Sequence, residues 1–138
     1  MARTPPRPTA HAELSTTRTG NAAETVAWQL LQARGLELLE RNFRCRAGEL
    51  DLVMRERGTV VIVEVRYRRD ARLIHPATTV TLRKQRRLLH AAAVLLRARP
   101  ALRDLPLRFD VLALSGDLRD PQADWLRGAF NASDAGMP

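Results

Sequence analysis

GELDLV at residues 48–53 and VVIVEVRYR at residues 60–68 are the two stretches of sequence that decide this fold. Both are rich in valine, isoleucine and leucine, and the second combines β-branched and aromatic residues, which favour strands. Between them, Glu56-Arg57-Gly58 is a turn signal. The pattern predicts two adjacent strands of one sheet.

Carboxylates stand among the apolar residues of both strands. Because alternate side chains of a strand share a face, Glu49 and Asp51 are expected to project together, and Glu64 is expected beside Arg66. The side chains expected on the face opposite Glu49 and Asp51 are Leu50, Leu52 and Met54. Acids are rarely buried unless they are paired or bind a metal. The two strands therefore indicate a divalent-cation site, which suits phosphodiester chemistry.

Helices and further strands flank this pair. We expect a helix from Asn21 to about Arg34, ended by Gly35, and a long helix over residues 79–99, ended by Pro100. The other expected elements are strands at 36–44, 49–55, 59–68 and 107–115, and a short element of undefined type at 124–131. The order α-β-β-β-α-β predicts a three-layer α/β domain with a mixed β-sheet flanked by helices.

Length and composition indicate one domain, because 138 residues with 45% apolar content are enough for a single core. We expect this domain over residues 19–132, with a disordered, basic, proline-containing tail at 1–18 and a short tail at 133–138. The sequence has neither a membrane-length apolar run nor a secretory signal, and its single cysteine, Cys45, excludes an intramolecular disulfide. We expect a cytoplasmic protein without a membrane partner; the oligomeric state stays open.

The charge of the chain points to a polyanionic partner. The net charge is +8 and the pI about 11.4, which favours nucleic acid, although an arginine-rich composition alone gives the same numbers. Of the 23 basic residues only Lys84 is a lysine. The candidate phosphate contacts, each of which also suits a solvated surface, are Arg66, Arg68, Arg69, Arg83 and Arg87.

Asp51 and Glu64 are the strongest candidate metal ligands. Carboxylates from neighbouring strands can share one hard cation that keeps water positions open, and Mg²⁺ or Mn²⁺ suits such oxygen ligands. The alternative is that each acid pairs with an arginine at a sheet edge. Glu49 lies next to the turn, and its position favours a salt bridge or an outer supporting role over direct ligation.

Two other acids have structural alternatives. Glu24 lies at the margin of the apolar face of the first helix and can reach the sheet, but Asn21 and Glu24 also have the spacing of a capping box. Spacing alone leaves these two interpretations open. Asp110, in the stretch Leu107–Val111, is expected to pair with Arg108.

Lys84 and Gln85 are the polar residues that the long helix is expected to turn inward. Lys84 continues an apolar stripe, and Gln85 continues a second one, whereas Arg83, Arg87 and their neighbours occupy the outward face. A lysine is a compact charge whose pKa falls on desolvation, a property that arginine lacks. The alternative is a lysine that extends its charge to solvent along the surface.

Six ordered motifs resemble the YraN family of uncharacterised bacterial proteins, over about residues 20–131. They are Gly20-x-x-Ala23-Glu24, Asn42-Phe43-Arg44, Gly48-Glu49-Leu50-Asp51-Leu52-Val53, Val63-Glu64-Val65-Arg66-Tyr67-Arg68, Lys84-Gln85 and Arg108-Phe109-Asp110-Val111. This family is similar to small members of the restriction-endonuclease-like, PD-(D/E)xK superfamily, which implies that three-layer fold.

The resemblance also implies roles for individual residues. Asp51 matches the aspartate of the superfamily motif, Glu64 its second acid, and Glu24 the acid of the preceding helix, which favours Glu24 as a metal ligand over the capping box. The motif lysine is replaced by Arg66, which cannot serve as a general base. Relatives in which the lysine moves to the following helix make Lys84 the candidate substitute.

These observations give a leading hypothesis and two alternatives. The first is a Mg²⁺-dependent, nuclease-like protein that processes nucleic acid, DNA in preference to RNA. In it Glu24, Asp51 and Glu64 hold the metal, while Arg66, Lys84 and Gln85 orient water and stabilise charge. The second is a nucleic-acid-binding module of the same fold without catalysis, and the third is an adaptor whose basic face binds a protein. The residues do not decide whether the chain turns over a substrate.

Overall fold

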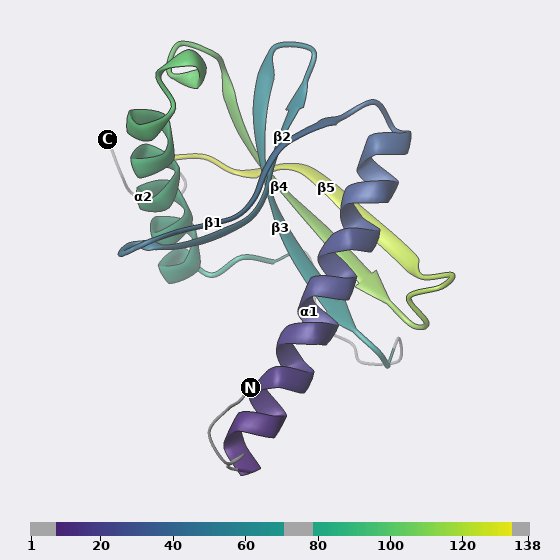
Figure 1. Cartoon of the computed structure of the whole chain (residues 1–138). Helices are drawn as coiled ribbons and strands as arrows, with labels where there is room; N and C mark the ends of the chain where they lie inside the picture. Colours follow the sequence, from purple (N-terminus) through teal and green to yellow (C-terminus); the bar gives the residue numbers. More distant parts are fainter. Residues whose placement is uncertain (1–7, 71–78, 134–138) are drawn as a thin grey trace.

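The computed structural model describes residues 8–70 and 79–133, with side chains from residue 21 onward (Figure 1). Its elements are α1 (Pro8–Ala33), β1 (Glu37–Cys45), β2 (Gly48–Glu56), β3 (Thr59–Arg68), α2 (Leu82–Ala98), the 3₁₀ turn η1 (Pro100–Leu102), β4 (Leu107–Ser115) and β5 (Gln122–Phe130). This order confirms the expected α-β-β-β-α-β core. The element of undefined type near the C-terminus is a fifth strand.

The five strands form one sheet in the order β1-β2-β3-β4-β5. β1, β2 and β3 pair antiparallel, β3 and β4 pair parallel, and β5 pairs antiparallel with β4. Parallel neighbours need a crossover connection, and the chain between β3 and β4 contains α2. The mixed sheet is therefore as predicted.

One helix covers each face of the sheet, so the core has two halves (Figure 1). Strands buried on both faces read as continuous apolar runs, which explains the uninterrupted stretch Val60–Val63. The half beneath α2 contains Val60, Ile62, Leu88, Ala91, Leu95, Phe109 and Val111. The half beneath α1 contains Ala23, Ala27, Leu31, Val61, Val63, Leu112 and Leu114. This arrangement confirms the three-layer α/β architecture.

The first helix is longer than the sequence predicted. It was expected to begin at Asn21, with residues 1–18 as a disordered tail, but α1 begins at Pro8. Residues 9–18 contain neither proline nor glycine, and Pro8 stands at the first helical position, where its missing N–H costs little. Residues 1–7 and 134–138 lie outside the described residues. No helix in the described part of the chain is both long and apolar enough to cross a membrane.

The strand alternation expected around Asp51 is wrong in one respect. Leu50 packs beneath α2, whereas Leu52 and Met54 pack beneath α1, so the three side chains do not share a face. Leu52 is the first β2 residue in the pairing with β3, and before it β2 pairs with β1 alone. Within that stretch of β1, Asn42 has a left-handed φ of 53°. The hairpin therefore leaves the plane of the sheet at Asp51, and simple alternation fails there.

Candidate functional site

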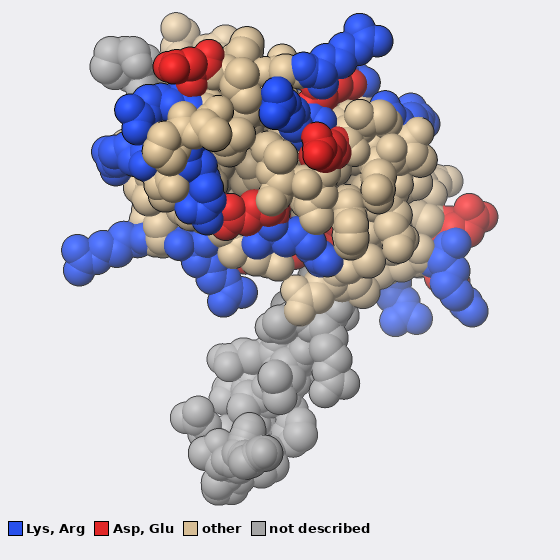
Figure 2. Space-filling view, turned by 45° about the horizontal axis from the view of Figure 1, so that its top comes forward, with Lys and Arg blue, Asp and Glu red and all other residues tan. Residues whose placement is uncertain are grey.

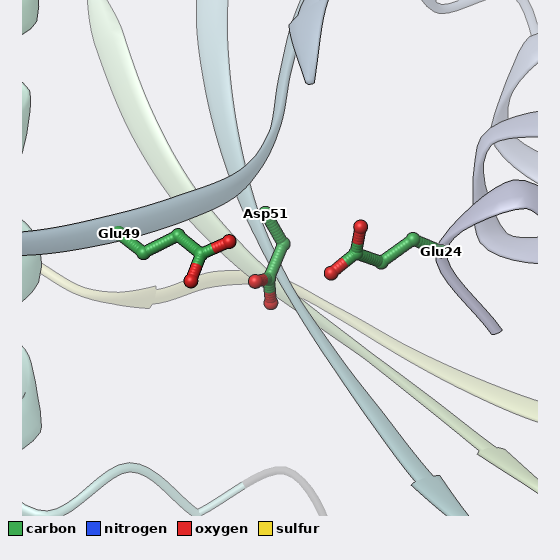
Figure 3. Close-up of side chains that lie close together, drawn as sticks. All are labelled: Glu24, Glu49 and Asp51. Atoms are coloured by element: carbon green, nitrogen blue, oxygen red, sulfur yellow. The ribbon is translucent and has the colours of Figure 1, made fainter. Parts of the chain in front are cut away.

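Three carboxylates from two elements meet where β2 separates from β3. Glu24 comes from α1, Glu49 and Asp51 come from β2, and one oxygen of each lies within 4.8 Å of the others. Asp51 lies between the other two in Figure 3. Asn21 is inside α1, so Glu24 does not belong to a capping box at a helix start. The structure therefore assigns Glu24 to the carboxylate cluster, defined as Glu24, Glu49 and Asp51.

Asp51 has few partners that stabilise its charged form. The backbone N–H of Val65 donates a hydrogen bond to Asp51 Oδ2 at 2.9 Å, in place of the strand pairing that stops at Leu52. Burial, followed by the negative charge of Glu64, raises the pKa of Asp51 from 3.8 to about 7, against that hydrogen bond. Asp51 is therefore partly protonated near neutral pH, where an ordinary aspartate is fully ionised.

Glu24 is in a similar state. Burial, then the charges of Asp51 and Glu49, raise its pKa from 4.5 to about 7, although Arg41 lowers it. Glu24 Oε1 is buried and has no hydrogen-bond partner among the described residues. Its nearest ion pair, to Arg41 Nη2, is 3.9 Å long, because Arg41 donates its hydrogen bonds to Thr25 and the Asn21 carbonyl instead.

Glu64 faces the cluster from β3 and is paired with two cations. Its Oε2 lies 3.5 Å from Lys84 Nζ and 4.0 Å from Arg66 Nε, and its side chain is 11% exposed. The expectation that Glu64 lies beside Arg66 is therefore confirmed. The structure brings Glu64 within charge interaction of Asp51, but Glu49, and not Glu64, completes the closest group of three carboxylates.

The helix α2 contributes Lys84 and Gln85 from the other face of the sheet. The hydroxyl of Thr81 caps α2 by accepting from Lys84 N, and the Gln85 side-chain amide donates to the Val80 carbonyl at 2.9 Å. Gln85 Oε1 is buried without a hydrogen-bond partner among the described residues. Lys84 is more accessible than its place in the apolar stripe suggested, with 37% of its side chain exposed.

The arginines proposed as phosphate contacts occupy different environments. Arg66 donates to the carbonyl of Thr79, and Arg68 is half-buried at the end of β3. Arg69, Arg83 and Arg87 are exposed. In Figure 2 basic side chains gather on the left of the molecule, where Figure 1 places α2 and the tip of the β1–β2 hairpin. This surface is positive and adjoins the element that carries Lys84.

The donor set of the carboxylate cluster fits a hard divalent cation. All its candidate ligands are carboxylate oxygens, and one oxygen of the cluster, Glu24 Oε1, is buried without a hydrogen-bond partner among the described residues. Two oxygens on opposite sides of one Mg²⁺ are about 4.2 Å apart, twice the metal–oxygen bond. Only one pair among three ligands can be opposite, and adjacent oxygens are about 3.0 Å apart, so oxygens within 4.8 Å of one another need to close by up to roughly 1.8 Å around a shared ion.

Sequence reasoning treated Glu49 as an outer residue of the site. It placed Glu49 on the side of Asp51, which is correct, but favoured a salt bridge because the residue lies near the turn. The structure contains the salt bridge, because Glu49 Oε2 lies 3.5 Å from Arg44 Nε. It also places a Glu49 oxygen within 4.8 Å of the oxygens of Glu24 and Asp51. The available signal was the spacing of the two acids in Glu49-Leu50-Asp51.

A mixed sheet with one helix on each face, and acids where two antiparallel strands separate, define a three-layer α/β protein with the restriction-endonuclease-like architecture. The sequence profile described as "Uncharacterised protein family UPF0102" matches residues 23–114. The chain belongs to this family, which is the YraN family indicated by the motifs.

Curated relatives agree with this assignment. A UPF0102 protein of Pseudomonas putida (strain GB-1) is 49% identical over 117 residues, which cover 84% of this chain and 95% of the relative. A UPF0102 protein of Xanthomonas campestris pv. campestris (strain B100) is 49% identical over 115 residues, covering 83% and 93%. These names describe a family and state no activity.

Proposed function

We propose that this protein binds nucleic acid, with DNA the expected partner ahead of RNA, and acts on phosphodiester bonds with a Mg²⁺ or Mn²⁺ ion held at Asp51. The observation that carries the proposal is the carboxylate cluster, whose two more buried members have pKa values raised to about 7. Buried acids without enough cations are costly for folding, so a role in binding a cation explains why they persist. The net charge of +8 supports a polyanionic partner.

The residues around the cluster suit distinct tasks. Glu24 and Asp51 would hold the ion, with Glu64 or Glu49 as a further ligand; Glu64 remains the ligand implied by the family motif. A bound ion would supply an acidified water and neutralise charge on the phosphate. Lys84 places an ammonium beside Glu64, from which it can donate to a phosphate oxygen or a water.

Arg66 and Gln85 are better placed to hold these groups than to move protons. The Arg66 guanidinium connects Glu64 to the carbonyl of Thr79, just before α2, and so fixes the approach of that helix. Gln85 Nε2 donates a hydrogen bond to the Val80 carbonyl, and the buried Gln85 Oε1 remains available to accept one from a donor at the site. In this role both residues position Lys84 and the carboxylates.

One observation favours the alternative of a binding module without catalysis. The superfamily lysine is Arg66 here, and its guanidinium is engaged by the Thr79 carbonyl. A protein that had lost catalysis would keep its positive surface and its fold, whereas the residue at the position of the motif lysine would be free to change. The two functions differ in what a divalent ion does: it is required for cleavage in the first and is dispensable for binding in the second.

Metal binding is the first test. Titration of the protein with Mn²⁺, followed by electron paramagnetic resonance or calorimetry, is expected to show binding that Asp51→Asn abolishes. Asp124→Asn, which removes an exposed carboxylate on β5, is the matched control and should bind as the wild type does. Equal Mn²⁺ binding by both variants would contradict the proposed site.

Nucleic acid is the second test. Duplex, single-stranded and branched DNA, with the RNA equivalents, are incubated with the protein and Mg²⁺, Mn²⁺ or EDTA. Cleavage that needs the ion and is lost in Asp51→Asn supports the nuclease. Binding that weakens steeply with salt but is indifferent to the ion, with no cleavage of any substrate, would establish the binding module instead.

A further inference from the structure

A second charged site lies at the opposite end of β3 from the carboxylate cluster. It is a groove of about 540 Å³ where the end of α1, the β2–β3 turn, the start of β4 and the second half of β5 meet. We call it the arginine pocket; its charged and polar lining is Arg34, Arg57, Arg108, Arg127, Glu56 and Thr59. Four arginines against Glu56 in the lining, and the buried Asp110 behind Arg108, leave a net positive charge at the pocket.

Two of the four arginines are fixed in place. Arg108 donates through Nε and Nη2 to both oxygens of the buried Asp110, and Nη2 also donates to Glu56 Oε1 at 2.9 Å. Arg127 donates to the same Glu56 oxygen at 2.8 Å, and its guanidinium stacks 3.9 Å from the ring centroid of Trp125. Although burial opposes it, the hydrogen bonds from Arg108 and Arg127 lower the pKa of Glu56, so this acid stays ionised and holds both cations.

The remaining donors are free to meet a ligand. Arg34 and Arg57 are exposed, and neither has an ion pair or a side-chain hydrogen bond within residues 8–70 and 79–133. No hydrogen bond between described residues uses Arg108 Nη1, whereas its Nε and Nη2 are occupied. The ordered guanidinium groups of Arg108 and Arg127 lose little entropy on binding, and the planar forks of all four arginines match the oxygens of a phosphate.

We propose that the arginine pocket binds phosphate groups. Its volume exceeds that of one phosphate and accommodates two or more joined groups, as in a nucleotide or a strand of nucleic acid. The pocket is roughly 15 Å from the carboxylate cluster, because Arg34 follows the end of α1 ten positions after Glu24 and each helical residue rises about 1.5 Å. Binding there does not depend on a metal ion or on catalysis.

The test uses inorganic pyrophosphate as the probe, in EDTA so that the carboxylate cluster takes no part. Amide resonances of ¹⁵N-labelled protein are followed during the titration, and the Gly35 and Thr59 amides are expected to shift. The double variant Arg34→Ala/Arg57→Ala removes only exposed side chains and is expected to weaken binding at least about tenfold. Arg97→Ala/Arg103→Ala removes two exposed arginines elsewhere and is the control.

Equal weakening by the two double variants, or shifts centred away from Gly35 and Thr59, would overturn the proposal, because only net charge would then matter. A single-stranded oligonucleotide in EDTA identifies the source of the phosphate. Weaker binding in the pocket variant than in the control indicates strand phosphates, and loss of pyrophosphate binding alone indicates a free nucleotide; either result supports the pocket. Asp51→Asn should leave pyrophosphate affinity unchanged, so failure of the nuclease proposal leaves this one standing.

Discussion

Asp51 and Asp110 are aspartates on two strands of the same sheet with opposite surroundings. Asp110 is 1% exposed and accepts hydrogen bonds from Arg108, the Trp125 indole and the Gly128 N–H. Among the described residues Asp51 accepts one hydrogen bond, from the Val65 N–H, and it faces other carboxylates. The chain therefore can satisfy a buried aspartate completely, and at Asp51 it does not.

The contrast separates an acid that serves the fold from one that serves a ligand. Each donor around Asp110 belongs to β4 or β5, so the network fastens the two strands together. The groups around Asp51 come from α1, β2, β3 and α2, and among the described residues no cation forms an ion pair with Asp51 itself. Functional sites commonly sacrifice stability in this way.

The largest expected effect is at Asp110. Asp110→Asn turns a bidentate, charged acceptor into a neutral one beside Arg108, and should lower the free energy of unfolding by about 3 kcal/mol, as removal of one partner of a buried pair does. Asp117→Asn is the control, because its pair with Arg119 is exposed and its loss should change the free energy of unfolding far less. Urea unfolding measures both, and equal losses would remove the structural role of Asp110.

The cations of the two regions differ as well, with Lys84 beside Glu64 and Arg108 beside Asp110. The next test replaces the ammonium of Lys84 with a guanidinium. Lys84 presents a compact ammonium to Glu64, so Lys84→Arg should reduce metal-dependent cleavage nearly as much as Lys84→Ala, about a hundredfold. Arg97→Lys, on the exposed end of the same helix, should have no effect. Full cleavage by Lys84→Arg would show that only positive charge is needed there.

A smaller effect of opposite sign to that at Asp110 is expected at Asp51. Asp51→Asn keeps an acceptor for the Val65 N–H but removes a charge from the carboxylate cluster, so the metal-free protein should become more stable by about 1 to 2 kcal/mol at pH 8. The same variant should lose any stabilisation by Mn²⁺. Thermal melts with EDTA and with Mn²⁺ check this, and destabilisation in EDTA would make Asp51 a structural residue.

A further expected effect, spread over about three pH units, is a fall of stability with rising pH. The folded protein binds protons at Glu24 and Asp51 up to about pH 7, whereas the unfolded chain releases them near pH 4. Between these values the folded state holds more protons, so the free energy of unfolding should fall as pH rises from about 4 to about 7 and then level off. Glu24→Gln and Asp51→Asn should each flatten this fall in EDTA; an unchanged slope would contradict the raised pKa values.

Local patterns in the sequence were sufficient for most of the fold. The apolar run Val60–Val63 and the helix stop at Gly35 are signals that a few neighbouring residues carry, and strand β3 has the predicted bounds, whereas α2 begins at Leu82, three residues after the expected start at Thr79. The pairing of Asp110 with Arg108 is also confirmed, because the two residues share a strand face.

Features that depend on distant partners were missed. The change of face at Asp51 follows from where β2 leaves β3, and the local alternation of residues does not encode that point. Glu56 and Arg127 are 71 residues apart, so nothing in either neighbourhood indicates that they meet in the arginine pocket. The acids of the candidate site could be selected from the sequence, but their grouping required the fold.

The hydrogen bond from Gly128 to Asp110 has a consequence for how this protein behaves at high concentration. β5 is an edge strand, and an edge with free N–H groups is a template on which another chain can extend the sheet. At Gly128 the φ is +60° and the pairing with β4 is shifted, and the N–H is used inside the fold, next to the charged Arg127. An irregular, charged edge resists strand addition, so the network that joins β4 to β5 also protects the sheet from aggregation.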